Sequence, residues 1–298
     1  MGAPDNGRLR LPRLAARPLV KDENSIMNRK DISFAGVVTR RQVLALSAGA
    51  ATPVVLKVGG TGSMVALLGH VGDAMSAETA GLRLMVVPSL GSSGGIKAVV
   101  AGAIDLALTG RPPKPEETAA GLEHTLLGRT GLVLAVGPNR PDTALSTRQL
   151  LDIFHGRATT WPDGEPIRIV LRPESDIDTF LLRNWSPAMA EAVDEARKRP
   201  GMVTGATDQE SAEAIQKIPG AIGTIALAQI QAERLSLRPI TLDGHVPTLA
   251  DLGRVPYPIE KPIYVVTRAG AASGGGTIRR FLASPAGHRL LDSFAMID

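Results

Sequence analysis

Residues 86–112 read VVPSLGSSGGIKAVVAGAIDLALTGRP, and the pattern of this stretch changes several times within a short distance. An apolar run ends in a segment rich in Gly and Ser, an apolar pattern with helical spacing follows over 96–102, and a second apolar run covers 104–110. Short apolar runs that alternate with helical patterns are typical of α/β domains. The stretch therefore predicts a strand, a small-residue loop, a helix and a further strand.

The same alternation continues along the rest of the chain from Val54 onward. Apolar runs predict strands, and patterns with a 3.6-residue period predict helices. Repeated strand–helix units imply mainly parallel pairing with right-handed crossovers. We expect further strands at 54–60, 82–88, 125–138, 167–173, 221–226 and 262–268. We expect further helices at 63–76, 146–156, 179–185, 189–199 and 207–217, and two short C-terminal helices that are split at Ser284-Pro285.

The composition narrows the class of protein. The chain has 298 residues, of which 44% are hydrophobic and 21% charged, enough for one large or two medium domains. It has no cysteine, which excludes a disulfide framework, a thiolate metal site and a cysteine nucleophile. The five histidines show no metal-ligand spacing. We therefore expect neither a metal site nor a cofactor.

The positive charge of the chain is concentrated at its N-terminal end. Of 33 basic and 29 acidic residues, nine and four lie in residues 1–53, which leaves 24 basic and 25 acidic residues in 54–298. The remainder is close to neutral and only 3% of the chain is aromatic, so the sequence does not support nucleic-acid binding. The excess of basic residues belongs to the N-terminal segment.

That N-terminal segment has the pattern of an export signal. TRRQVLALSAGAA (39–51) places the twin arginine Arg40-Arg41 before a short apolar run and small residues that suit cleavage after Ala50. Translation from Met27 would give the charged region a conventional length. The alternative is an N-terminal arm that stays on the protein. We predict a twin-arginine signal within 1–53 and a periplasmic location.

Three loops rich in Gly, Ser and Thr follow predicted strands, and the first two also open helices. They are GGTGS (59–63), GSSGG (91–95) and Thr109-Gly110. A helix that opens after such a loop leaves backbone N–H groups unpaired at its positive end, and glycine lets a ligand approach the backbone closely. Several such loops at strand ends predict an anion site. The alternative is that these residues are small only for packing.

These segments resemble those of a known family. GGTGSMVALL (59–68), the stretch 86–112 and TTWPDGEPIRIVLRPESDIDTFLL (159–182) occur in the order seen in phosphate-type periplasmic binding proteins of ABC transporters. The resemblance extends from about Val54 to the C-terminus. It implies a two-lobe α/β fold with a hinge that closes on an oxyanion. It also implies a membrane permease as partner, and we expect the binding protein to be a monomer.

The resemblance also implies domain boundaries and binding residues. We expect one lobe to comprise 54–140 and 255–298 and the other 141–254, with a linker near 138–145. The implied ligand-binding residues come from four loops, and Arg172 would pair bidentately with the anion. They are Thr61, Gly62 and Ser63; Ser92, Ser93, Gly94 and Gly95; Thr109 and Arg111; and Arg172, Ser175, Asp176 and Asp178.

The fourth loop departs from the family pattern. Arg172 and Phe180 keep the family spacing, but Asp176 and Asp178 replace two residues that usually donate hydrogen bonds. A carboxylate about 4 Å from a singly charged anion repels it by about 4 kcal/mol at an effective dielectric constant of 20. Three explanations remain open: the carboxylates point away, Ser175 donates from a shifted loop, or the ligand carries an amine or several hydroxyls.

The GSSGG segment also fits the Gly-x-Ser-x-Gly pattern of a serine hydrolase, with Ser93 as the nucleophile. Asp178 with His245 or His288 could complete such a triad. Against this, Pro88, Ser89 and Leu90 lie between the apolar part of the predicted strand and the first glycine, so the sharp turn that exposes a nucleophile is not evident. We therefore expect a binding protein rather than an enzyme.

Overall fold

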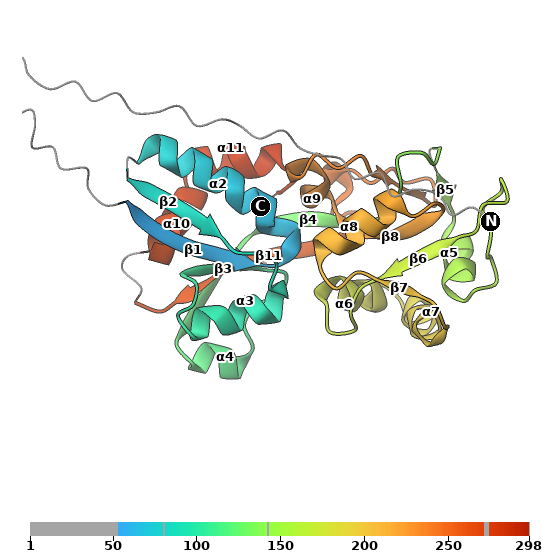
Figure 1. The fold of residues 1–298 in the computed structure, drawn as a ribbon, viewed down its shortest axis with the longest axis horizontal. Coiled ribbons are helices and arrows are strands. Elements are labelled where there is room, and N and C mark those ends of the chain that lie inside the picture. Colours follow the sequence, from blue (N-terminus) through green and yellow to red (C-terminus); the bar gives the residue numbers. More distant parts are fainter. Residues whose placement is uncertain (1–52, 80, 142, 271–273, 298) are drawn as a thin grey trace, which may run out of the picture. The chain divides into compact units, whose positions relative to one another are not determined.

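The computed structural model describes residues 53–79, 81–141, 143–270 and 274–297 (Figure 1). The twin-arginine segment and Met27 lie outside these ranges, so the export signal stays a prediction. Within the described ranges, no helix is both long enough and apolar enough to cross a membrane.

One sheet of nine strands organises the described part of the chain, in the order β2-β1-β3-β11-β4-β8-β6-β7, with β9 paired to β4. A separate small sheet pairs β5 (Ala144–Leu145) with β10 (Thr241–Leu242). The strands of the large sheet are β1 (Val54–Gly60), β2 (Leu82–Val86), β3 (Leu106–Thr109), β4 (Leu122–Val136), β6 (Arg168–Leu171), β7 (Val203–Thr204), β8 (Ala221–Ala226), β9 (Arg238–Pro239) and β11 (Ile259–Arg268).

The large sheet is parallel toward its two ends and antiparallel in its middle. β1 pairs in parallel with β2 and β3, and β6 pairs in parallel with β7 and β8. Between them β11 runs antiparallel to β3 and β4, and β4 runs antiparallel to β8. The α/β fold class is confirmed. The antiparallel centre differs from the expected mainly parallel sheets, because β4 and β11 run antiparallel to each other and to their neighbours β8 and β3.

Ten α-helices of the described residues accompany the sheet, and polar side chains cap several of them at the N-terminus. Ser146 accepts a hydrogen bond from the N–H of Gln149, and Ser284 accepts one from the N–H of Gly287. The short α4 was not predicted. The helices are α2 (Val65–Glu78), α3 (Gly91–Val100), α4 (Pro115–Ala119), α5 (Thr147–Phe154), α6 (Ile177–Asn184), α7 (Pro187–Lys198), α8 (Asp208–Lys217), α9 (Leu227–Ala232), α10 (Gly274–Leu282) and α11 (Pro285–Ser293), with 3₁₀ turns η1 (Gly62–Met64) and η2 (Leu249–Asp251).

The helix after β2 begins earlier than the sequence pattern predicts. The segment GSSGG, expected as a loop, forms the first turn of α3. Gly91 has a φ of +66°, a backbone conformation that residues with a side chain rarely adopt. This glycine lets the chain turn from the preceding extended segment directly into the helix, so Ser92, Ser93 and Gly94 lie within the first helical turn.

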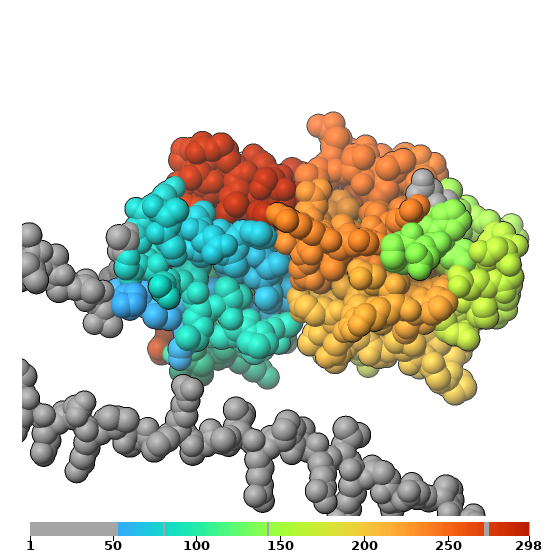
Figure 2. Space-filling model, turned by 45° about the horizontal axis from the view of Figure 1, so that its top comes forward, coloured from blue at the N-terminus to red at the C-terminus, as the bar shows by residue number. Residues whose placement is uncertain are grey.

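The hydrophobic core is divided into clusters on either side of the central strands. One contains Val58, Leu68 and Ile263, and a small neighbouring cluster lies under α3. Another contains Leu150 and Ile222. In Figure 2 the blue-to-teal and red residues gather on one side and the yellow-to-orange residues on the other. Both β4 and β11 contribute to clusters on both sides, and the exact lobe boundaries stay a prediction.

Candidate functional site

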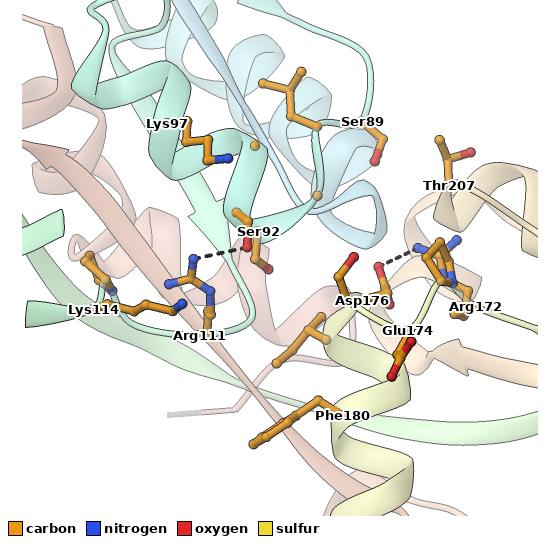
Figure 3. Close-up of a pocket in the computed structure, with 18 of the residues that line it drawn as sticks. Ser89, Ser92, Lys97, Arg111, Lys114, Arg172, Glu174, Asp176, Phe180 and Thr207 are labelled. Atoms are coloured by element: carbon orange, nitrogen blue, oxygen red, sulfur yellow. Dashed lines mark hydrogen bonds and ion pairs between the residues drawn. The ribbon is translucent and has the colours of Figure 1, made fainter. Parts of the chain in front are cut away.

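A cleft of about 1010 Å³ lies where two groups of loops face one another (Figure 3). One wall is formed by the first turn of α3 and by the loop that follows β3, residues 111–115. The opposite wall is formed by residues 172–180, which lead from β6 into α6, and by Ala206 and Thr207 before α8. Ligand crevices of α/β proteins form at the carboxyl ends of strands, as these loops do.

The cleft gathers part of the predicted binding set. The residues that line it are Ser92, Ser93, Gly94, Arg111, Arg172, Ser175 and Asp176. The others are covered by protein or lie behind the walls: Thr61, Gly62, Ser63, Gly95, Thr109 and Asp178.

Packing and local hydrogen bonds account for most of the residues behind the walls. The hydroxyls of Thr61 and Ser63 are buried and lie 3.3 Å apart. The Thr109 hydroxyl donates to the Arg111 carbonyl oxygen at 2.8 Å. At Gly95, a Cβ atom would lie only 2.8 Å from the Cα of Gly60, so a side chain would push α3 away from β1. At Gly95, close packing of α3 against β1 therefore explains why the residue is small.

Two serines of α3 bind the loop after β3. The N–H of Gly110 donates to the Ser92 hydroxyl at 2.9 Å, and Nη2 of Arg111 donates to the Ser93 hydroxyl at 3.1 Å. Arg111 also donates to both carboxylate oxygens of Glu117, at 2.8 and 3.0 Å. That hydrogen bond from Arg111 lowers the pKa of Glu117 to about 2. The positive charge of Arg111 is thus already countered by the carboxylate of Glu117 on α4.

Arg172 is paired within the protein rather than free. Its Nη2 donates to Asp176 at 2.9 Å and to Asp208 at 3.1 Å, and its Nη1 donates to the Gly205 carbonyl oxygen at 2.7 Å. Its side chain is only 3% exposed. Two carboxylates therefore already accept hydrogen bonds from Arg172, and the bidentate pairing of Arg172 with an anion stays a prediction.

A buried lysine completes this network. Lys261, on β11, places Nζ 2.5 Å from Oδ1 of Asp178 and 3.9 Å from Oδ1 of Asp208. Burial acts to lower the pKa of Lys261, but the attraction of Asp178 and then Asp208 outweighs it and raises the pKa. Lys261 and Asp208 were missed from the sequence. The available signal was a lysine directly before the apolar run at 262–268.

The two aspartates of the divergent loop have different environments. Asp178 is 3% exposed and turns to Lys261, away from the cleft. Asp176 lines the cleft, accepts the N–H of Asp178 at 2.9 Å as the N-cap of α6, and pairs with Arg172. Burial, followed by repulsion from Asp178, raises the pKa of Asp176 to about 6 against the attraction of Arg172. When all its groups are ionised, the network contains three carboxylates and only two cations, and it therefore carries one net negative charge.

The residues considered for a hydrolase are not brought together. Ser93 accepts a hydrogen bond from Arg111, and Asp178 pairs with Lys261. His288 lines a separate cavity beside β4 and α10. Across the described ranges, no group of three or more His, Cys, Asp or Glu side chains is placed to hold a metal ion.

Comparison with curated proteins finds phosphate-binding relatives. The phosphate-binding protein PstS 2 of Streptococcus agalactiae is 26% identical over 106 residues, and that of Streptococcus pneumoniae is 30% identical over the same length. The aligned part is 36% of this chain and 36% of each relative. The match thus spans about a third of the length of these relatives.

Solved structures share the fold over most of the chain. A putative phosphate ABC transporter substrate-binding protein from Clostridium perfringens, solved with bound phosphate, has a TM-score of 0.67 at 21% identity and covers 82% of this chain and 99% of its own. A phosphate-binding protein from Stenotrophomonas maltophilia has a TM-score of 0.60 at 15% identity, with 82% and 90% covered. Residues 47–285 match the family model of the PBP superfamily domain. The chain therefore belongs to the PBP superfamily domain family.

Proposed function

We propose that this chain is an exported solute-binding protein that captures a small polar ligand, phosphate or a related oxyanion, for import by an ABC transporter. The observation that carries the proposal is the meeting of the first turn of α3 with the arginine-bearing loops of both walls at one cleft. The first N–H groups of a helix have no partner within it and favour negative charge. The names of the relatives and of the structural neighbours support the same ligand class.

The proposed capture uses neutral donors more than free charge. Backbone N–H groups of the first α3 turn and the Ser93 and Ser175 hydroxyls would hold the anion, because Arg111 and Arg172 are already paired. Thr61, Ser63 and Thr109 would act by holding the helix and loop in place. Approach of the two walls around the ligand would shift the protein toward a closed form.

A second candidate ligand carries an amine or several hydroxyls. The observation that favours it is the pair of acidic side chains on the wall opposite α3, Glu174 and Asp176. An amine would find a carboxylate there, whereas an oxyanion would meet repulsion.

The proposal includes a route and a partner. The twin arginine Arg40-Arg41 supports export to the periplasm by the twin-arginine route, and a membrane permease would receive the ligand. We propose a monomer that neither binds nucleic acid nor catalyses a reaction. The same proposal includes one lobe made of residues 54–140 and 255–298 and a second lobe made of residues 141–254.

Thermal unfolding with added ligand tests the proposal. A ligand that binds only the folded state at 100 times its Kd adds about 2.7 kcal/mol, which raises the Tm by several degrees. We expect phosphate, sulfate or arsenate at millimolar concentration to produce such a rise, and Ser93→Ala to reduce it. Ser293→Ala, an exposed serine on α11, is the matched control. An unchanged Tm with every oxyanion would refute the oxyanion assignment.

A further inference from the structure

The two walls of the cleft present unpaired charges of opposite sign. Lys97 of α3 and Lys114 before α4 stand on one wall, and Glu174 stands on the other (Figure 3). All three side chains are exposed. The nearby ion pairs engage Arg111 with Glu117 and Arg172 with two aspartates. Among the described residues, neither lysine nor Glu174 has an ion-pair partner within 4 Å, although Lys114 attracts Glu117 and Glu174 attracts Arg197 at longer range.

The charge difference between the walls extends below the surface. The positive charge of Arg111 is countered by Glu117, so the two lysines set the sign on their side. On the other side, Asp176 is the cleft-facing member of a network that holds three carboxylates against two cations. A field therefore runs across the cleft from the lysine wall to the acidic wall. Such a field orients a ligand that carries both charges.

Apolar side chains lie between the charged groups. Phe180 is 56% exposed and Leu90 is 40% exposed, and both line the cleft with Ile177 and a run of prolines. In Figure 3 the ring of Phe180 extends below the space between Arg111 and Asp176. The volume of about 1010 Å³ falls at the upper end of the roughly 300–1,000 Å³ found for organic ligands, and far exceeds what one oxyanion fills.

We infer that the cleft selects a zwitterionic organic solute, a phosphorylated amine, over a simple oxyanion. Its phosphate group binds beside Lys97, Lys114 and the first turn of α3. Its amine faces Glu174 and Asp176, and its short apolar segment lies along Phe180. The inference rests on the proposed capture function and names the ligand class of the same site. The first turn of α3 and the acidic loop opposite it would then bind the same ligand, α3 through the phosphate group and the loop through the amine.

Calorimetric titration of the purified chain at low ionic strength tests this assignment with three probes. Phosphoethanolamine carries a phosphate ester and a primary amine, ethyl phosphate has the same two-carbon chain without the amine, and inorganic phosphate has neither part. We expect phosphoethanolamine to bind about fivefold more tightly than ethyl phosphate, the upper range for an exposed charge pair. Glu174→Gln should reduce this preference, since only Asp176 then faces the amine, and Lys97→Gln should weaken both organic probes.

Glu191→Gln, an exposed acid on α7 outside the cleft, is the matched control and should keep the preference. Equal affinity for the two organic probes overturns the inference and leaves anion capture standing, as does tighter binding of inorganic phosphate. A preference that is the same in Glu174→Gln as in the wild type also overturns it. Absence of binding by all three probes contradicts the proposed function itself, and the inference fails with it.

Discussion

Lys261 and Asp178 form a buried ion pair behind the cleft, with 2.5 Å between Nζ and Oδ1 and side chains that are 0% and 3% exposed. The pair ties the antiparallel centre of the sheet to the start of α6. Two charges leave water at a cost of several kcal/mol each, which only close pairing and further hydrogen bonds offset. The network behind the cleft therefore belongs to the core of the protein as well as to its site.

Loss of one partner of this pair is expected to destabilise the protein strongly. Lys261→Met leaves Asp178 buried without its counter-ion and should lower the free energy of unfolding by about 3–5 kcal/mol, measured by urea denaturation. The double variant Lys261→Met/Asp178→Leu removes both charges and should recover most of the loss. A double variant as unstable as Lys261→Met would show that the unpaired charge of Asp178 is not the cause of the lost stability.

Two adjacent glycines of α3 are expected to respond differently to alanine. A Cβ at position 95 would lie 2.8 Å from the Cα of Gly60 and 3.2 Å from the Cβ of Ala107, so Gly95→Ala should cost about 1–3 kcal/mol. Gly94→Ala meets only the Cβ of Leu90 at 3.2 Å and gains helix propensity of about 1 kcal/mol. Guanidinium denaturation of both variants checks this, and similar losses would contradict the packing role of Gly95.

The neighbouring serines offer a second matched pair. Ser92→Ala leaves the N–H of Gly110 without its buried acceptor, which should cost about 1–3 kcal/mol in the free energy of unfolding. Ser93 is exposed, so Ser93→Ala should change stability by no more than about 0.5 kcal/mol. Equal effects in chemical denaturation would mean that the contact between Ser92 and Gly110 contributes nothing.

The raised pKa of Asp176 predicts a pH dependence of stability. Burial raises this pKa from 3.8 to about 6, so between these values the folded state holds more of this proton than the unfolded state. The contribution of Asp176 to stability is therefore full below the lower value and is lost as the pH rises through the upper one. Relative to Asp176→Asn, which keeps an N-cap residue, the wild type should lose stability from pH 4 to 6.

Denaturation at several pH values measures that difference. The charged groups around Asp176 are Arg172, Asp178, Asp208 and Lys261, with Arg197 at longer range, and all five are unchanged in the variant. Asp163→Asn is the control. The backbone N–H of Glu165 lowers the pKa of Asp163, so any pH-dependent difference should lie below its usual value of 3.8 and have the opposite sign. A wild-type minus Asp176→Asn difference that stays constant would rule out the titration of Asp176.

Local patterns allowed much of the fold to be predicted. The strand at 54–60 and the break between the last two helices at Ser284-Pro285 agree with the structure, because periodicity and helix termination depend on residues close together in the chain. The start of α3 was placed too late, since a glycine-rich segment resembles a loop unless its backbone angles are known. Of the three small-residue loops, GSSGG lines the cleft, whereas GGTGS and Thr109-Gly110 do not.

The sequence by itself determined the alternation of strands and helices, the resemblance to the family and the small residues at the start of α3. Each of these features can be recognised from residues close together in the chain. Only the tertiary structure decided which charges meet. Arg172, Asp208 and Lys261 come from three distant segments, and they meet because the sheet places β11 and β4 between its two parallel parts. Coulomb energy depends on distance and on local dielectric, and both are set by folding. The pairing of Arg172, and with it the charge left for a ligand, could not be deduced from residue spacing.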